Sequence, residues 1–145
     1  MIEDKIKDKV VLVTGVSSGI GRETAQLLAE RAARVFGTVR DFGRNGDLPD
    51  VELIHMDVAD DTSVQDGVKS VLEKAGKVDI LINNAGYGLA GALEETRVEE
   101  AQQLFDTNFF GVLRVTQAVL PAMRRQRNGR IVNISSGTRF PSRAV

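Results

Sequence analysis

The residues of this sequence that are best suited to bind a ligand form a glycine- and serine-rich run at positions 14–21, Thr-Gly-Val-Ser-Ser-Gly-Ile-Gly. In such a run the first glycine allows a tight turn, the second lets the backbone approach a phosphate, and the third lets a helix pack closely on a sheet. A helix that begins here directs free N–H groups and a positive dipole end at the anion. We therefore expect a pyrophosphate to contact Gly15, Ser17, Ser18, Gly19, Ile20 and Gly21. A glycine-rich turn without a ligand is the alternative.

Polar residues also follow three later hydrophobic runs. Asp57, Asn83 and Ser135 each come where such a run ends. Open α/β sheets bind ligands in the crevice outside the carboxyl ends of their strands. If these runs are parallel strands, their polar ends therefore belong to the same site as the 14–21 run.

Alternating strands and helices must position these residues. Short β-branched runs predict strands, and longer stretches with helical periodicity separate them. Asp60 or Asp61 can cap the second helix, which stops at Gly76, while Pro121 predicts a kink or late break in the third. The alternation predicts βαβ units with a parallel sheet, in one domain spanning residues 1–145. The expected strands cover residues 9–14, 34–39, 51–56, 78–82 and 130–134, and the expected helices cover residues 20–31, about 61–74 and about 98–126.

The composition excludes several classes of function. The chain has no cysteine, so thiol catalysis and disulfides are excluded, and its single histidine, His55, speaks against a multi-histidine metal site. A net charge of -1 gives no field that attracts nucleic acid, and no apolar run approaches the roughly 20 residues that span a bilayer. No Gly-Lys-Ser/Thr follows the glycine turn, which excludes an NTPase phosphate loop. We expect no metal, no nucleic-acid partner, no membrane partner and a cytoplasmic location.

Five motifs appear in the order found in the short-chain dehydrogenase/reductase family, which this chain resembles from about residue 9 to residue 136. They are the 14–21 run, Asp57-Val58, Asn83-Asn84-Ala85-Gly86, Asn108-x-x-Gly111 and Ile131-Val132-Asn133-Ile134-Ser135-Ser136. The resemblance implies an α/β fold with a Rossmann-type doubly wound parallel sheet, five strands in the order 3-2-1-4-5 and helices on both faces. It also implies a nicotinamide-dependent oxidoreductase that transfers hydride between NAD(P)(H) and a small carbonyl or alcohol substrate.

The resemblance also implies cofactor contacts. In the family's pattern Asp57 and Val58 hold the adenine ring, with a plain loop or cap residue as the alternative for Asp57. The segment at the end of the fourth strand lies beside the cofactor, through Asn83, Ala85 and Gly86. Asn84, the remaining residue of that segment, either joins this contact or ties neighbouring strands together.

Two further residues resemble catalytic positions of the family. Ser136, with Ser135 beside it, would bond to the substrate oxygen; a polar strand end is the alternative. Asn108 interrupts the apolar stretch 104–113, so we expect it to be buried and hydrogen-bonded, because an unsatisfied amide costs roughly 1–3 kcal/mol. In the family it holds a water of a proton relay, and a helix-bulge asparagine that bonds local backbone is the other interpretation.

The end of the second strand predicts the cofactor preference. An acidic residue there accepts hydrogen bonds from a ribose diol and favours NAD(H). This chain instead has Val39 followed by Arg40, whose guanidinium can hold a 2′-phosphate with two hydrogen bonds. We therefore expect NADP(H) in preference to NAD(H), although the adjacent Asp41 keeps the second possibility open.

The chain departs from the family in its last part. The family's acid/base tyrosine lies four residues before a lysine, but the only tyrosine here, Tyr87, has Gly91 at that distance. The tail 137–145 is atypical of the family. With one choice of codons, a one-base shift of the reading frame restores a family-like sequence, so we hypothesise a frameshift. Natural or deliberate truncation are the alternatives. We expect a sheet that is incomplete on the C-terminal side, a homo-oligomer and little activity. A catalytically inactive dinucleotide-binding fragment is therefore the alternative function.

Overall fold

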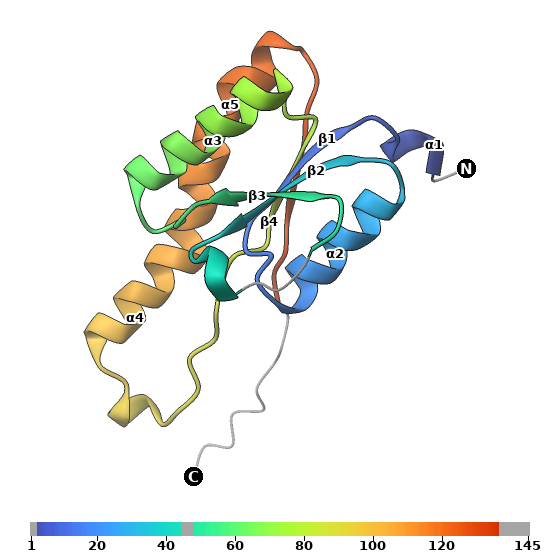
Figure 1. The fold of residues 1–145 in the computed structure, drawn as a ribbon. Helices are drawn as coiled ribbons and strands as arrows, with labels where there is room; N and C mark the ends of the chain where they lie inside the picture. The colour runs from blue at the N-terminus through green and yellow to red at the C-terminus, as the bar shows by residue number, and fades with distance from the viewer. Residues whose placement is uncertain (1–2, 45–47, 137–145) are drawn as a thin grey trace.

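The computed structural model describes residues 3–44 and 48–136, and they form a five-stranded parallel sheet (Figure 1). The strand order is β3-β2-β1-β4-β5, which confirms the predicted Rossmann-type order. Each pair of neighbours runs in parallel, with Val11 beside both Val35 and Ile80. The strands are β1 (Val10–Val13), β2 (Arg34–Val39), β3 (Val51–His55), β4 (Ile80–Asn83) and β5 (Arg130–Asn133). The predicted atypical tail, residues 137–145, lies outside the described residues.

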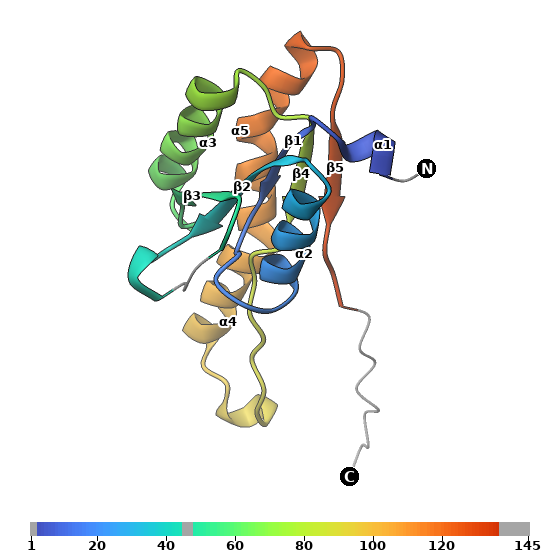
Figure 2. The same ribbon diagram turned by 45° about the vertical axis from the view of Figure 1, so that its right-hand side comes forward.

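Helices cover both faces of this sheet, as the sequence predicts (Figures 1 and 2). Helix α2 (Gly19–Glu30) packs on one face, while α3 (Asp61–Ala75) and α5 (Gly111–Arg125) pack on the other. The central strand β1 shows why both faces are apolar: Leu12 packs with the α3 and α5 side chains, and Val13 packs with those of α2. Successive strand side chains point to opposite faces, and both of these are fully buried because helices cover both faces.

The ends of α3 agree with the sequence. The Asp60 carboxylate accepts a hydrogen bond from the Ser63 backbone N–H at 2.6 Å, as an N-cap does. At the other end Gly76 adopts the left-handed conformation, with φ of +73°, and its N–H donates to the Leu72 carbonyl. The choice left open between Asp60 and Asp61 is therefore settled in favour of Asp60.

The expected long helix 98–126 is divided into three parts. It begins as α4 (Val98–Phe105), passes through a π-helical turn at Asp106–Phe110, and continues as α5. Pro121 lies inside α5, which continues to Arg125, so the proline does not end the helix. Three short elements were not predicted: α1 (Glu3–Ile6), η1 (Phe42–Arg44) and η2 (Leu93–Glu95). Within the described residues, every helix is too short or too polar to cross a lipid bilayer.

Candidate functional site

A hollow of about 500 Å³ lies at the carboxyl edge of the sheet. Every strand contributes to its lining through the segment that follows it, and the π turn adds Thr107. The lining residues are 15, 17–20, 38–40, 56–58, 84–87, 107 and 134–136. The structure thus brings together the predicted turn with Arg40, Asp57, Val58, Ala85, Gly86 and Ser136, whereas Gly21, Asn83 and Asn108 do not line this hollow.

The glycine-rich turn is held tightly against the segment after β4. Gly15 has φ of +71°, and a Cβ atom there would lie 2.8 Å from the Cα of Ala85. Its backbone N–H donates to the Thr38 hydroxyl at 3.1 Å, and the N–H of Val16 donates to the Thr38 carbonyl at 3.0 Å. Only glycine fits this position, because any side chain would collide with backbone.

The N-terminus of α2 opens onto this hollow, and its N-cap side chain makes no capping bond within the described residues. Its N-cap residue, Ser18, has an extended backbone, and its side chain makes no capping hydrogen bond; the first turn contains no acidic residue. Helix α3 differs, since Asp60 caps it. The first N–H groups of a helix have no partner within the helix, so those of α2 are available to an anion in the hollow.

Asn84 and Thr14 join the turn to the end of β4. The Asn84 side-chain amide donates to the carbonyl oxygens of Thr14 and Gly15, at 3.0 and 2.9 Å. The Thr14 hydroxyl accepts from the backbone N–H groups of Asn84 and Ala85, both at 3.0 Å. Gly21 is needed here because a Cβ atom would collide with the Asn84 amide. The structural role considered for Asn84 is therefore present.

Asp57 and Val58 form the wall of the hollow beyond β3. The Asp57 carboxylate accepts from the Ala59 N–H at 2.9 Å, and its own N–H donates to the Ser63 hydroxyl at 2.9 Å. Asp57 thus has the loop role that the sequence offered as an alternative, and it also lines the hollow. Val58 is 6% exposed, so its side chain belongs to the core.

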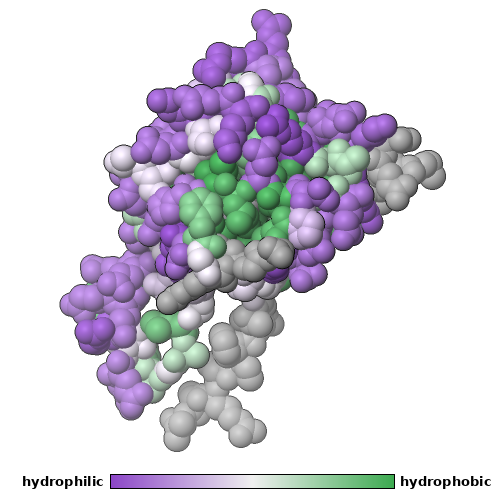
Figure 3. Space-filling model, viewed as in Figure 1, coloured by the Kyte–Doolittle hydropathy of each residue, from purple (hydrophilic) through white to green (hydrophobic). Residues whose placement is uncertain are grey.

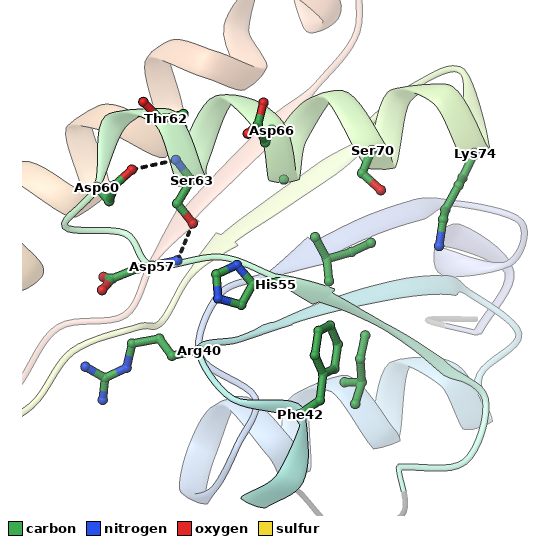
Figure 4. A pocket seen from close by; sticks show the side chains of 13 residues that line it. Arg40, Phe42, His55, Asp57, Asp60, Thr62, Ser63, Asp66, Ser70 and Lys74 are labelled. Atoms are coloured by element: carbon green, nitrogen blue, oxygen red, sulfur yellow. Dashed lines mark hydrogen bonds between the residues drawn. The ribbon is translucent and has the colours of Figure 1, made fainter.

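Arg40 stands between this hollow and a second one of about 680 Å³, which extends along β3 and α3. Arg40 and Asp57 line both hollows. In Figure 4 their charged ends point to the same side, away from Lys74 at the far end of the second hollow. Figure 3 shows apolar surface at the centre of this face, surrounded by polar residues. Phe42 and Leu53 supply apolar lining of the second hollow.

Asn83 is buried within the sheet. It is 4% exposed, and its side-chain amide donates to the Thr116 hydroxyl at 3.1 Å and to the Asn133 side-chain oxygen at 2.9 Å. These bonds tie β4 to β5 and α5. A direct cofactor contact by this side chain stays a prediction.

Asn108 is exposed, so its expected burial is wrong. The apolar stretch around it lies on an open face of the π turn and α5, where the side chains of Phe109 and Phe110 are 59% and 47% exposed. Asn108 nevertheless has partners: its amide donates to the Tyr87 carbonyl at 2.7 Å, and its oxygen accepts from the Tyr87 N–H at 3.0 Å. It is a helix-bulge asparagine, but it bonds backbone 21 positions away rather than local backbone.

Ser135 and Ser136 are exposed and lie on the rim of the hollow after β5. The preceding Ile134 is tied to β4 through its N–H, which donates to the Asn83 carbonyl at 2.9 Å. The structure thus brings Ser136 to the same hollow as Gly86. Its bond to a substrate stays a prediction.

Sequence reasoning included Thr14 in the 14–21 run but missed the role of its hydroxyl, and it missed Thr38 altogether. Both are 1% exposed, and both hydroxyls hold the glycine-rich turn in place. Tyr87 and Thr107 of the lining were also missed.

Comparisons with known proteins agree with this geometry. The sequence model of the family described as short chain dehydrogenase matches residues 9–144. The chain is 44% identical to a 3-ketodihydrosphingosine reductase of Bacteroides thetaiotaomicron over 131 residues, which covers 90% of this chain and 48% of that protein. It is 41% identical to retinol dehydrogenase 8 of Bos taurus over 140 residues, which covers 88% of this chain and 44% of that protein. The chain thus spans a little under half the length of these relatives.

Solved structures show the same likeness in three dimensions. A short-chain dehydrogenase from Streptomyces avermitilis matches with a TM-score of 0.83 and 41% identity, over 90% of this chain and 50% of that one. The ligand-free aldohexose dehydrogenase of Thermoplasma acidophilum matches with a TM-score of 0.85 and 32% identity, over 91% of this chain and 51% of that one.

Proposed function

Because this chain belongs to the short-chain dehydrogenase family of oxidoreductases, we propose that its hollow binds a nicotinamide dinucleotide, NADP(H) in preference to NAD(H). The observation that carries the proposal is the uncapped start of α2, which opens into the hollow behind a turn that only glycine can form. Free N–H groups and the helix dipole suit paired phosphates. The start of α3 differs, because its Ser63 N–H group already donates to the Asp60 cap.

The preference for NADP(H) is supported by the residues at the end of β2. Val39 is 2% exposed, and its apolar side chain offers no acceptor to a ribose diol. Arg40 is exposed at the border of the two hollows, and no protein hydrogen bond engages its guanidinium within residues 3–44 and 48–136. A 2′-phosphate placed there would accept two parallel hydrogen bonds from the N–H groups of the Arg40 guanidinium.

The rest of the lining suits the other parts of the ligand. Asp57 and Val58 would hold the adenine ring, and Ala85 and Gly86 would let the dinucleotide pass close to the end of β4. When bound, the nicotinamide ring supplies the hydride that reduces a carbonyl or accepts the hydride of an alcohol. Ser136 lies on the same rim and would donate a hydrogen bond to the substrate oxygen.

A second candidate function is binding of the dinucleotide without turnover. The sequence observation that favours it is the single tyrosine, Tyr87, which is followed by Gly91 rather than lysine four positions later. A tyrosine titrates near about 10 and needs a cationic neighbour to work at neutral pH. Without such an acid/base, a rate contribution of roughly 10²–10⁴-fold is lost.

Calorimetric titration of the 145-residue chain with NADPH and NADH tests the proposal. We expect both to bind and NADPH to bind more tightly. Equal or tighter binding of NADH contradicts the preference, and the absence of binding by either contradicts the proposed function. Turnover of a panel of carbonyl compounds with NADPH separates the two candidates, because measurable turnover excludes the non-catalytic one.

We also propose that the chain self-associates. Along α4, the π turn and α5 the structure exposes a series of large apolar side chains, between 46% and 67% exposed. They are Val98, Phe105, Phe109, Phe110 and Leu113. Apolar patches of this kind mark interaction surfaces in proteins.

A further inference from the structure

Arg114 of α5 joins the nearby π turn to the segment between β3 and α3, more than 50 positions earlier in the sequence. Its Nε donates to the Asp61 carboxylate at the start of α3, and its Nη2 donates to the Asp106 carboxylate in the π turn, both at 2.7 Å. Its Nη1 donates to the carbonyl oxygens of Asp106 and Val58, at 3.1 and 3.3 Å. The side chain is 23% exposed, so these bonds are partly shielded from solvent.

Two of the hydrogen bonds from Arg114 hold Asp106, the residue that begins the π turn. The Asp106 carbonyl accepts from the N–H of Gly111, which is the bond that spans the turn, and it accepts from Arg114 as well. Since the guanidinium also holds the Asp106 carboxylate, it bonds to both the main chain and the side chain of this residue. Such wide turns are often found at functional sites.

The π turn supports one wall of the hollow. Thr107 lines the hollow itself, and Asn108 pairs with both backbone groups of Tyr87. The neighbouring Gly86 is in close contact with the same asparagine, because a Cβ atom there would lie 3.0 Å from the Asn108 oxygen. The position of the 86–87 wall therefore depends on the position of the turn.

The wall formed by residues 57–58 is held by the same part of the helix. A Cβ atom on Gly111 would lie 2.8 Å from the Val58 side chain, so α5 approaches this wall as closely as a glycine allows. Arg114 adds a hydrogen bond to the Val58 carbonyl. Hydrogen bonds to Asp106 and Asp61 outweigh partial burial and raise the pKa of Arg114, which keeps its charge in place.

We propose that Arg114 is a positioning residue which, by joining the π turn to Val58, sets the separation of the two walls, residues 57–58 and 86–87, between which the dinucleotide binds. Arginine suits this role because its planar fork directs five donors at fixed angles, whereas lysine offers a single charged point. The ligand in this statement rests on the proposed function, but the order of the two walls can be measured without it.

The experiment compares Arg114→Met with Arg34→Met by amide hydrogen exchange of the unliganded chain. Arg34 is a matched control because it also donates to a carboxylate, that of Glu52, and to a carbonyl, that of Lys74, but it lies at the start of β2, away from the hollow. In Arg114→Met we expect the amides of Ala59 and Tyr87 to exchange about tenfold faster than in the native chain, since charged hydrogen bonds are lost. In Arg34→Met we expect these two amides to be unchanged.

Arg114→Lys keeps the charge and replaces Arg114→Met in the experiment if the methionine variant does not fold. In Arg114→Lys we expect an increase in exchange between that of the native chain and that of Arg114→Met. In calorimetric titration we expect Arg114→Met to weaken NADPH binding about tenfold and Arg34→Met to leave it within about twofold. Exchange at Ala59 and Tyr87 that does not exceed that of the control overturns the inference. If the native chain binds no dinucleotide, the proposed function fails, and the exchange comparison still decides the role of Arg114.

Discussion

At the residue scale, adjacent side chains of one motif have different tasks. Asn83 points into the sheet and bonds Thr116 and Asn133, while Asn84 reaches back to the carbonyl oxygens of Thr14 and Gly15. The sequence predicts that this segment ends a strand beside the site, and the structure places it there. Which side chain faces the hollow could not be predicted, because that depends on the register of β4 against β1 and β5.

Arg40 carries the residue-scale prediction about the cofactor. In Arg40→Gln we expect NADPH to bind about tenfold more weakly and NADH to be nearly unaffected, because only the 2′-phosphate loses its charged donors. Calorimetric titration with both dinucleotides measures this. Arg125→Gln is the control, since Arg125 is exposed at the end of α5 and does not line the hollow. An equal loss for NADPH and NADH would contradict the role of Arg40.

Asp79 supports a prediction about pH. Its side chain is 6% exposed and accepts from the Val10 N–H at 2.8 Å and from Lys77 at 2.8 Å. Burial raises the pKa of this carboxyl, but the bonds from Lys77 and Val10 outweigh it and leave the pKa below its usual value. Because the pKa of Asp79 is lower in the folded than in the unfolded chain, its ionised form stabilises the fold at pH values above the unfolded-state pKa. This contribution is lost as the pH falls through the folded-state pKa.

We therefore expect Asp79→Ala to lower the free energy of unfolding by roughly 1–3 kcal/mol at pH 7, because the Val10 amide loses its acceptor. The difference from the native chain should shrink below about pH 4. Urea denaturation at pH 7 and pH 3 measures both effects. Asp66→Ala, an exposed residue of α3, is the control. A difference that stays constant with pH would exclude the ionised form of Asp79 as its source.

At the element scale, the strands and the three main helices could be predicted from periodicity and end signals. The division of the 98–126 segment could be anticipated only through the helix-bulge interpretation of Asn108, because apolar periodicity does not show the side-chain contacts made at the π turn. Asn108 bonds Tyr87, and Arg114 bonds Asp106 and Val58, and neither partner is visible in a pattern of apolar residues. Pro121 was expected inside this helix as a kink or late break, and α5 does continue beyond it, to Arg125.

The two helix starts give a matched pair of variants. We expect Asp60→Ala to lower the free energy of unfolding by about 1 kcal/mol, since the α3 cap bond to Ser63 is lost. We expect Ser18→Ala to leave the stability of the unliganded chain nearly unchanged, because the Ser18 side chain makes no cap bond in α2. Thermal or urea unfolding without ligand measures both. A loss in Ser18→Ala as large as that in Asp60→Ala would show that the start of α2 is capped after all.

At the scale of the whole molecule, the strand order came from the family resemblance rather than from the periodicity, which predicts only a parallel sheet with helices on both faces. The sheet itself is well covered: β1 is buried on both sides, and the apolar side chains divide into one cluster for each face. The face of α4 and the π turn is different, because its phenylalanine side chains are exposed. An exposed apolar face on the long helix agrees with the self-association expected from the sequence. Which side chains form this face could not be predicted, since an apolar stretch by itself indicates burial.

Self-association is the prediction at this scale. We expect sedimentation velocity of the purified chain to show dimers or larger species, and Phe109→Ser to shift the population towards the monomer, because it removes an exposed ring from the apolar face. Phe42→Ser is the control, since Phe42 is similarly exposed, at 56%, but lies in η1 beside β3. A native chain that remains monomeric at high concentration would contradict the prediction.

The bonds between the glycine turn and the segment after β4 have a consequence for biosynthesis. Thr14 and Gly15 are fixed by Asn84 and Ala85, which are made about 70 residues later. A nascent chain whose β4 has not yet left the ribosome holds the whole glycine turn and Thr38 but lacks the bonds from Asn84 and Ala85 that help to fix its shape. If the hollow binds the dinucleotide as proposed, capture must wait until Asn84 and Ala85 have emerged, and the ligand cannot assist the earliest steps of folding.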